Sequence, residues 1–191
     1  MFTLHKLGFT YPEREALFTA LSHHFNREEN ILLCGENGSG KSTLLKLLCG
    51  KLSPNAGKID TCEHPLFYLP QEADGRILGI TLEQDLSIWQ MAGMAVDAVK
   101  GHALMQGFGD IWRLPLRELS KGTRQCYLLS LALCLKDHYL VLDEPFTALD
   151  NDRRKLLADL LALRKGMLIV SHIQGLLIPD RTLLLAEGKL V

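Results

Sequence analysis

Residues 35–43 are the part of this 191-residue chain that most constrains its fold. They read Gly-Glu-Asn-Gly-Ser-Gly-Lys-Ser-Thr and match the pattern G-x-x-x-x-G-K-[ST]. Glycines let the backbone curl so that successive N–H groups point at phosphate oxygens. The apolar run 31–34 precedes this loop, and the helix-forming run 44–49 follows it and stops at Gly50. A strand, a glycine loop and a helix in this order predict a nucleoside triphosphate site.

The loop combines a flexible backbone with two reactive side chains. Lys41 supplies a positive charge for the outer phosphates, and the Ser42 hydroxyl can bind Mg²⁺. A helix that begins here adds the positive end of its dipole. The residues expected to bind the nucleotide are Gly35, Glu36, Asn37, Gly38, Ser39, Gly40, Lys41, Ser42 and Thr43. The loop alone does not say how the energy of the nucleotide is used.

Length and composition predict one domain with a sizeable core. Hydrophobic residues make up 47% of the chain, and its size fits one domain with a small inserted subdomain. The net charge is −1, from 21 basic and 22 acidic residues. Such a balance argues against bulk electrostatic binding to nucleic acid or to an anionic membrane surface.

The cysteines and the apolar runs predict a cytoplasmic protein. The five cysteines form no C-x-x-C pair, so we expect reduced, buried thiols at Cys34, Cys49, Cys62, Cys126 and Cys134. The first residues lack the pattern of a signal peptide. The longest apolar run, 127–135, has nine residues, whereas a membrane helix needs about 20. Any role at a membrane would therefore require a partner.

Short apolar runs alternate with helical patterns along the chain. Apolar segments at 2–4 and 7–9 suggest an early hairpin. Further strands are expected at 58–60, 66–69, 139–142, 167–170 and 182–186, and helices at 86–99, 103–112, 124–135 and 152–164. The alternation predicts an α/β fold whose parallel sheet is covered on both faces. Residues 72–118 are expected to form a small helical insert between core strands.

Two acids end the apolar run 139–142. Beside a phosphate loop, Asp143 would hold Mg²⁺, and Glu144 would orient or deprotonate a water molecule that attacks the last phosphate. The alternative is a simple acidic turn at the end of a strand, before Pro145.

Residues 119–125, Leu-Ser-Lys-Gly-Thr-Arg-Gln, resemble the Leu-Ser-Gly-Gly-Gln signature of ATP-binding-cassette (ABC) ATPases. Ser120 and Gly122 are retained, and a serine and a glycine at a helix start can bind phosphate. Lys121 replaces the first signature glycine and Thr123 the glutamine. The resemblance implies that Ser120 and Gly122 contact ATP held by the phosphate loop of an opposite protomer. Lys121 would either add charge near that ATP or weaken the close approach.

Four more elements of the same family occur in order. Tyr11, 24 residues before Gly35, resembles the aromatic residue that stacks on adenine. The alternative is an aromatic residue in a surface turn without this role. Gln71 resembles the glutamine that contacts Mg²⁺ and links the core to the helical insert. Asp150 matches the loop that crosses the dimer interface. His172 matches the switch histidine at the terminal phosphate, although a strand-end histidine is the simpler alternative.

A finer resemblance concerns the residues after Gln71. The segments 71–78 and 81–86 are similar to the ATPases of energy-coupling-factor importers of vitamins and metals. Gly75 and Arg76 depart from that pattern, where acidic residues and glutamine are favoured.

The family resemblance covers almost the whole chain and implies a complete architecture. It implies a phosphate-loop NTPase core with a mostly parallel sheet, an antiparallel β edge and a small helical subdomain. The chain would bind and hydrolyse ATP with Mg²⁺, and would dimerise around two ATP molecules with a second ABC ATPase chain, identical or paralogous. It would drive integral membrane subunits from the inner face of the membrane, for uptake of a small solute. The apolar residues expected to contact those subunits are Ile77, Leu78, Ile80, Leu86, Ile88 and Trp89.

Two other classes remain as alternatives. A soluble ABC ATPase acting on DNA needs long coiled-coil arms, but only 48 residues separate Gln71 from Ser120. Types that act on ribosomes carry two cassettes, and this chain shows one. A regulatory module without hydrolysis is supported only by Lys121, since Lys41 and Glu144 are retained.

Overall fold

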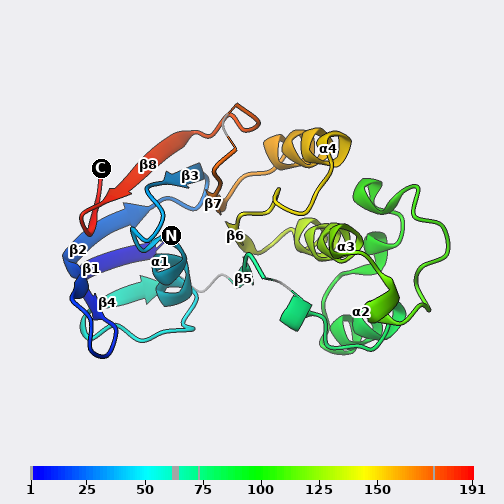
Figure 1. The fold of residues 1–191 in the computed structure, drawn as a ribbon, viewed down its shortest axis with the longest axis horizontal. Coiled ribbons are helices and arrows are strands. Elements are labelled where there is room, and N and C mark those ends of the chain that lie inside the picture. The colour runs from blue at the N-terminus through cyan, green and yellow to red at the C-terminus, as the bar shows by residue number, and fades with distance from the viewer. Residues whose placement is uncertain (1, 62–64, 73, 174) are drawn as a thin grey trace.

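The computed structural model describes residues 2–61, 65–72, 74–173 and 175–191. Two sheets meet at one side of the molecule, and most of the helices lie at the other (Figure 1). Both termini lie at the sheet side. Among the described residues, no helix combines the length and the apolar character needed to cross a membrane.

The larger sheet has the strand order β5-β6-β7-β3-β8-β9. All its pairs are parallel except β8 with β9, which are antiparallel. The strands are β3 (Asn30–Cys34), β5 (Leu66–Leu69), β6 (Tyr139–Asp143), β7 (Met167–Val170), β8 (Arg181–Ala186) and β9 (Lys189–Leu190). The α/β class with a mostly parallel sheet is therefore confirmed. Parallel order brings the carboxyl ends of β3, β6 and β7 to one edge, where the site is built.

The second sheet is antiparallel, with the order β2-β1-β4. It consists of β1 (Phe2–Thr10), β2 (Ala16–Phe25) and β4 (Ala56–Thr61). The expected hairpin between 2–4 and 7–9 is wrong, because both segments belong to the single strand β1. A bulge lies between them, where Lys6 has a φ of 46°. The true hairpin partner is β2, which pairs Phe2 with Phe25.

Helix α1 (Lys41–Leu48) lies between the two sheets. Its leucines join residues of β1, β2, β3 and β8 in one apolar cluster. Leu44 and Leu45 are fully buried there, and Gly50, with a φ of 65°, turns the chain out of the helix. Tight packing on both sides holds the start of α1 rigidly against the end of β3.

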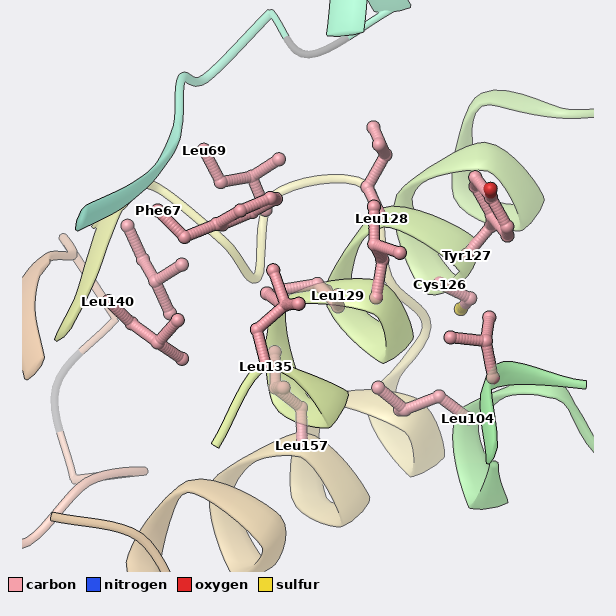
Figure 2. Packing of buried hydrophobic residues seen from close by; sticks show 14 of the residues in the cluster. Phe67, Leu69, Leu104, Cys126, Tyr127, Leu128, Leu129, Leu135, Leu140 and Leu157 are labelled. Atoms are coloured by element: carbon pink, nitrogen blue, oxygen red, sulfur yellow. The ribbon is translucent and has the colours of Figure 1, made fainter. Parts of the chain in front are cut away.

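A second apolar cluster covers the opposite face of the parallel sheet. Figure 2 shows Phe67 and Leu140 from adjacent strands facing Leu129 and Leu135, with Leu157 below. The contributing helices are α2 (Leu82–Met91), α3 (Lys121–Cys134) and α4 (Asn151–Ala162). Neighbouring residues of one strand point into different clusters, as expected for a sheet buried on both faces.

The segment between β5 and β6 is less helical than its sequence suggests. The predicted helix 86–99 is instead α2 followed by a 3₁₀ turn, Asp97–Val99, and Gly93 with a φ of 78° separates them. The predicted helix 103–112 is wrong beyond the short turn Ala103–Met105. Gly107 and Gly109 have φ values of 83° and 68°, which a continuing helix does not allow. The extent of 72–118 as a subdomain stays our proposal.

A buried carboxylate organises this segment. Asp85 is 0% exposed and accepts hydrogen bonds from the backbone N–H groups of Leu78 and Gly79, at 2.6 and 3.3 Å. It also accepts from Trp89 Nε1 at 3.0 Å and from the Tyr127 hydroxyl at 2.6 Å. Such bonds satisfy the charge in a site that would otherwise disfavour it. Asp85 thereby ties the loop after Gln71 to helices α2 and α3.

Removing one of these donors should measurably destabilise the fold. Tyr127→Phe is expected to lower the free energy of unfolding by about 1.5–3 kcal/mol, because a hydrogen bond to a charged group is lost and Asp85 keeps its burial. Tyr139→Phe is the matched control, since the buried Tyr139 hydroxyl has no hydrogen-bond partner among the described residues. Its effect should stay within about 0.5 kcal/mol. Urea unfolding of both variants checks this, and equal losses would contradict it.

The described thiols are free, but most are not fully buried. Only Cys126 is buried, whereas Cys34, Cys49 and Cys134 are half-buried, so the expectation of buried thiols is wrong for three of them. Desolvation raises the pKa of the Cys49 thiol to about 12 and that of Cys126 to about 11. These two groups are therefore unreactive thiols at neutral pH. Cys62 lies outside the described residues.

Candidate functional site

The glycine loop joins the end of β3 to the start of α1. Gly40 precedes the helix with a φ of 102°, and its carbonyl accepts the first helical hydrogen bond, from Leu44 N at 2.8 Å. Gly35 has a φ of 152°, and a Cβ there would lie 2.5 Å from the Leu185 carbonyl oxygen. Only glycine fits this approach to β8. The sequence therefore folds locally into a cradle with the helix N-terminus at its base.

Lys41 reaches back across the mouth of the cradle. Its Nζ donates hydrogen bonds to the carbonyl oxygens of Gly35, at 2.8 Å, and Glu36, at 2.9 Å. The side chain is largely buried. These bonds hold the ammonium where the outer phosphates of a nucleotide would lie.

Asp143 ends β6 beside Ser42. The carboxylate is 3% exposed, and its Oδ1 has no hydrogen-bond partner among the described residues. Burial raises the pKa of Asp143, and a hydrogen bond with Ser42 opposes that rise. An unpartnered buried carboxylate oxygen beside a hydroxyl fits Mg²⁺, which prefers oxygen ligands and keeps few protein contacts. The described residues contain no group of three or more His, Cys, Asp or Glu side chains that could hold a metal.

Glu144 follows in a strained conformation. Its φ is 52°, unusual for a residue with a side chain, and the carbonyl accepts bonds from Thr147 N at 3.3 Å and Thr147 Oγ1 at 3.0 Å. The backbone N–H of His172 donates to Oε2 at 3.3 Å, and His172 Nε2 lies at ion-pair distance, 3.3 Å, from Oε1. Burial raises the pKa of the Glu144 carboxyl. The backbone therefore bends at Glu144, and the carboxylate lines a cavity at the end of β6.

These groups line one cavity of about 610 Å³. Tyr11 lines it, with its hydroxyl 3.1 Å from Thr43 Oγ1, and so does Gln71, two residues after the end of β5. The predicted residues along the cavity are Tyr11, Asn37, Gly38, Gly40, Lys41, Ser42, Thr43, Gln71, Asp143, Glu144 and His172. Gly35, Glu36 and Ser39 belong to the loop but do not line the cavity. The volume is within the range of ligand pockets.

The remaining predicted residues lie in a second, smaller pocket of about 230 Å³. Ser120, Gly122 and Asp150 line it, and none of them lines the first cavity. Ser120 is the N-cap of α3 and accepts a bond from Thr123 N at 3.0 Å, while Asp150 caps α4. Within one chain, the structure therefore brings the predicted residues together as two separate groups.

Sequence reasoning missed several residues of both pockets. Arg14 and Glu15 line the first cavity, and their position just after Tyr11 was a usable signal. Phe108 and Arg153 line the second, with the guanidinium 4.2 Å from the ring centre. They come from distant segments, so no local pattern could have paired them.

Comparison with known proteins decides the family. Residues 18–147 match the family model described as ABC transporter. The chain belongs to the ABC transporter family. Among curated ABC relatives, it is 32% identical to the thiamine import ATP-binding protein ThiQ of Escherichia coli, covering 90% of this chain and 87% of that protein. It is 30% identical to a putative ABC transporter ATP-binding protein of Streptomyces avermitilis, covering 95% and 77%.

Solved structures support the same ABC fold. The dimeric ATP-binding cassette MJ0796 bound to ADP and phosphate superposes with a TM-score of 0.79, over 100% of this chain and 96% of that one. Sequence identity is 18%, so this likeness shows the fold alone. As an ABC transporter ATPase subunit, the chain binds and hydrolyses ATP, with Mg²⁺ as the metal. The roles of individual residues stay proposals.

Gly122 offers a direct test of the second pocket in this ABC ATPase. A Cβ at Gly122 would lie 2.8 Å from the Ala148 carbonyl oxygen, so Gly122→Ala must push the first turn of α3 away from the turn that contains Ala148. We expect ATP hydrolysis to fall on the order of 10- to 100-fold, as for displacements of about 1 Å, while ATP affinity stays unchanged. Gly75→Ala is the control, because a Cβ there meets nothing within 4 Å. Steady-state kinetics and equilibrium ATP binding check both variants, and wild-type hydrolysis by Gly122→Ala would contradict the role of this pocket.

Proposed function

We propose that this chain acts as one half of a head-to-tail ABC ATPase dimer that drives integral membrane subunits. The separation of the two pockets supports the dimer. Lys41 of the glycine loop and Glu144 line the first cavity. Ser120 and Asp150 line the second, and no residue lines both cavities. An opposite protomer can bring the second surface to the first. The second chain is another copy or a paralogue.

Each composite site then takes its catalytic groups from one chain. Tyr11 stacks on adenine, the loop 35–43 holds the phosphates, and Lys41 and His172 face the terminal phosphate. Ser42, Gln71 and Asp143 fit as ligands of Mg²⁺, which when bound neutralises phosphate charge. Ser120, Gly122 and Asp150 of the opposite chain cover the ATP.

Glu144 is the proposed general base for hydrolysis. Its carboxylate takes a proton as the water oxygen bonds to the terminal phosphorus, and the bond from that phosphorus to the bridging oxygen breaks, releasing ADP and phosphate. The bend at Glu144 and the N–H of His172 orient the carboxylate for this step. The remaining contribution is electrostatic and positional.

The two substitutions in the signature leave its serine well supported. Thr123 is largely buried and donates its backbone N–H to Ser120 Oγ, and the two hydroxyl oxygens lie 2.8 Å apart. Thr123 therefore keeps Ser120 in the capping position. Lys121 is exposed at the start of α3, and its positive charge can attract the phosphates of an opposing ATP. These contacts favour an active ATPase over a regulatory module.

An exposed apolar patch supports contact with membrane subunits. We call it the α2 patch and define it by Leu78, Ile80, Ile88 and Met91, which are 69%, 73%, 39% and 87% exposed. The sequence-based set was partly wrong. Ile77 and Leu86 are buried in the core, and Trp89 is partly buried with its Nε1 bonded to Asp85. Large exposed apolar residues on α2 and just before it are suited to a protein partner.

The transported molecule is proposed by class only. The relative named for thiamine import supports uptake of a small solute, with this subunit on the inner face of the membrane through its partners. The energy-coupling-factor subclass also stays a proposal, and its segment 71–78 includes residue 73, which lies outside the described residues.

Co-purification from the native membrane tests the proposed function. Wild type is expected to bring down an integral membrane protein, and that complex should hydrolyse ATP. The double variant Ile80→Asp with Met91→Asp should lose this protein, because charge enters the α2 patch. Leu163→Asp is the matched control, since Leu163 is 87% exposed at the end of α4. If all three chains recovered the same amount of the membrane protein, the α2 patch would not be the contact surface. If wild type recovered no membrane protein, the transporter role would be refuted.

A further inference from the structure

The Arg124 side chain joins two parts of the chain that serve different pockets. Its Nε and Nη2 donate to the two carboxylate oxygens of Asp74, both at 3.0 Å. Its Nη1 donates to the carbonyl oxygens of Leu116, at 2.9 Å, and Leu119, at 2.6 Å. Four of the five guanidinium N–H groups are thus engaged, two of them in a forked bond to a carboxylate.

One end of this arrangement supports Ser120. Leu119 directly precedes Ser120, and the backbone N–H of Arg124 donates to the Ser120 carbonyl at 3.1 Å. The Arg124 side chain therefore holds the turn that leads into Ser120, while its backbone closes the first turn of α3. The position of Ser120 depends on both contacts.

The other end leads to Gln71. Asp74 opens the 3₁₀ turn Asp74–Arg76, three residues after Gln71, which lines the ATP cavity. A second tie runs parallel to the first, because Leu116 N donates to the Ile80 carbonyl at 3.0 Å. Asp74 is bonded to Arg124, so this pair joins the segment that follows Gln71 to the turn before Ser120.

The burial of the two partners suits a link that opens and closes. The Arg124 side chain is 19% exposed, whereas that of Asp74 is 57% exposed. If Asp74 withdraws, water can solvate its carboxylate, and Arg124 keeps its two carbonyl bonds. A partly exposed pair of this kind is easily broken and reformed, unlike a fully buried one.

We propose that the Asp74–Arg124 pair is a positioning link that couples Gln71, at the ATP of its own chain, to Ser120, at the ATP of the opposite chain. This inference rests on the proposed dimer. If Gln71 shifts when ATP binds, Asp74, only three positions further along the chain, is displaced with it, and Arg124 passes the displacement to the turn before Ser120. The link thereby makes the two ATP sites cooperative.

Asp74→Asn is the cleanest test, because it removes the charge and leaves the carbonyl contacts of Arg124. In the assembled dimer, kcat for ATP should fall about fivefold or more, the low end of typical coupling between sites. The Hill coefficient for ATP should fall toward 1, and the Kd of the isolated chain for ATP should stay unchanged. Asp74→Glu, which keeps the charge, should restore most of the rate and the cooperativity.

Glu83→Gln is the matched control. Glu83 forms ion pairs with Arg113, at 2.9 Å, and Lys100, at 3.2 Å, on the same part of the molecule, but these do not reach Ser120. The proposed role of the Asp74–Arg124 pair is refuted if Asp74→Asn and Glu83→Gln show the same rate of ATP hydrolysis and the same Hill coefficient. If thermal unfolding shows that Asp74→Asn does not fold, Arg124→Lys tests the same link, because it keeps the charge and loses the forked geometry. Wild type that hydrolyses ATP only as a monomer would instead refute the proposed dimer, whatever Asp74 does.

Discussion

Glu144→Gln is expected to lower the rate of ATP hydrolysis by about 10²- to 10⁴-fold, the usual contribution of a general base. The amide cannot accept the proton of the attacking water. Its oxygen can still accept the hydrogen bond that His172 N now donates to Glu144 Oε2 at 3.3 Å, so the bend should persist. ATP should then remain bound between two chains, and a stable dimer should accumulate. Phosphate release and size-exclusion chromatography with ATP and Mg²⁺ measure the two effects.

The control for this variant is Asp152→Asn. Asp152 is an exposed acid in the first turn of α4, away from the cavity residues. We expect a wild-type rate and no trapped dimer from it. An unchanged rate of ATP hydrolysis in Glu144→Gln would show that Glu144 is not the general base. Slow hydrolysis without accumulation of a dimer would argue against a site shared by two chains.

Lys41→Ala should weaken ATP binding by roughly 100-fold, within the 2–5 kcal/mol that follows truncation of a buried charged partner. The ammonium now bonded to the carbonyl oxygens of Gly35 and Glu36 is the largely buried cation of the loop. Alanine removes this charge and leaves the loop to bind the phosphates through its backbone N–H groups, the end of the helix and the bound Mg²⁺. Equilibrium binding of ATP with Mg²⁺ measures this loss.

Lys51→Ala provides the comparison for Lys41→Ala. Lys51 is exposed beyond the end of α1, so its removal changes the net charge equally and leaves the cradle intact. Its affinity for ATP should match that of wild type. If the Lys41→Ala chain bound ATP as tightly as wild type, Lys41 would not hold the phosphates. If both variants lost the same affinity for ATP, the change in net charge would explain the loss.

Local patterns predicted most of the groups that line the first cavity, which we propose holds ATP. In the loop 35–43, glycines occupy the positions that need a positive φ or a close approach to a neighbouring segment. The conformation of the loop could therefore be predicted from these residues. The apolar run before Asp143 forms β6, and the acids appear at its end. Such motifs are readable because adjacent residues provide both the conformation and the chemistry.

The sequence was less informative between β5 and β6. The run 103–112 contains good helix formers, but Gly107 and Gly109 adopt positive φ values and end any helix there. Apolar residues near Gln71 looked alike, although Ile77 is buried and Ile80 is exposed. Burial in this segment depends on Asp85, whose four hydrogen bonds come from residues up to 42 positions away.

The sequence by itself determined that this chain is an ATP-binding cassette, because loop, acids and signature are each encoded within a few neighbouring residues. Only the tertiary structure decided how these motifs are distributed. It places Ser120, Gly122 and Asp150 in one pocket and Lys41 and Glu144 in another, and it joins Asp74 to Arg124 across 50 residues. The physical reason is that contacts between distant segments depend on how helices pack on the sheet. No short window of sequence records that packing.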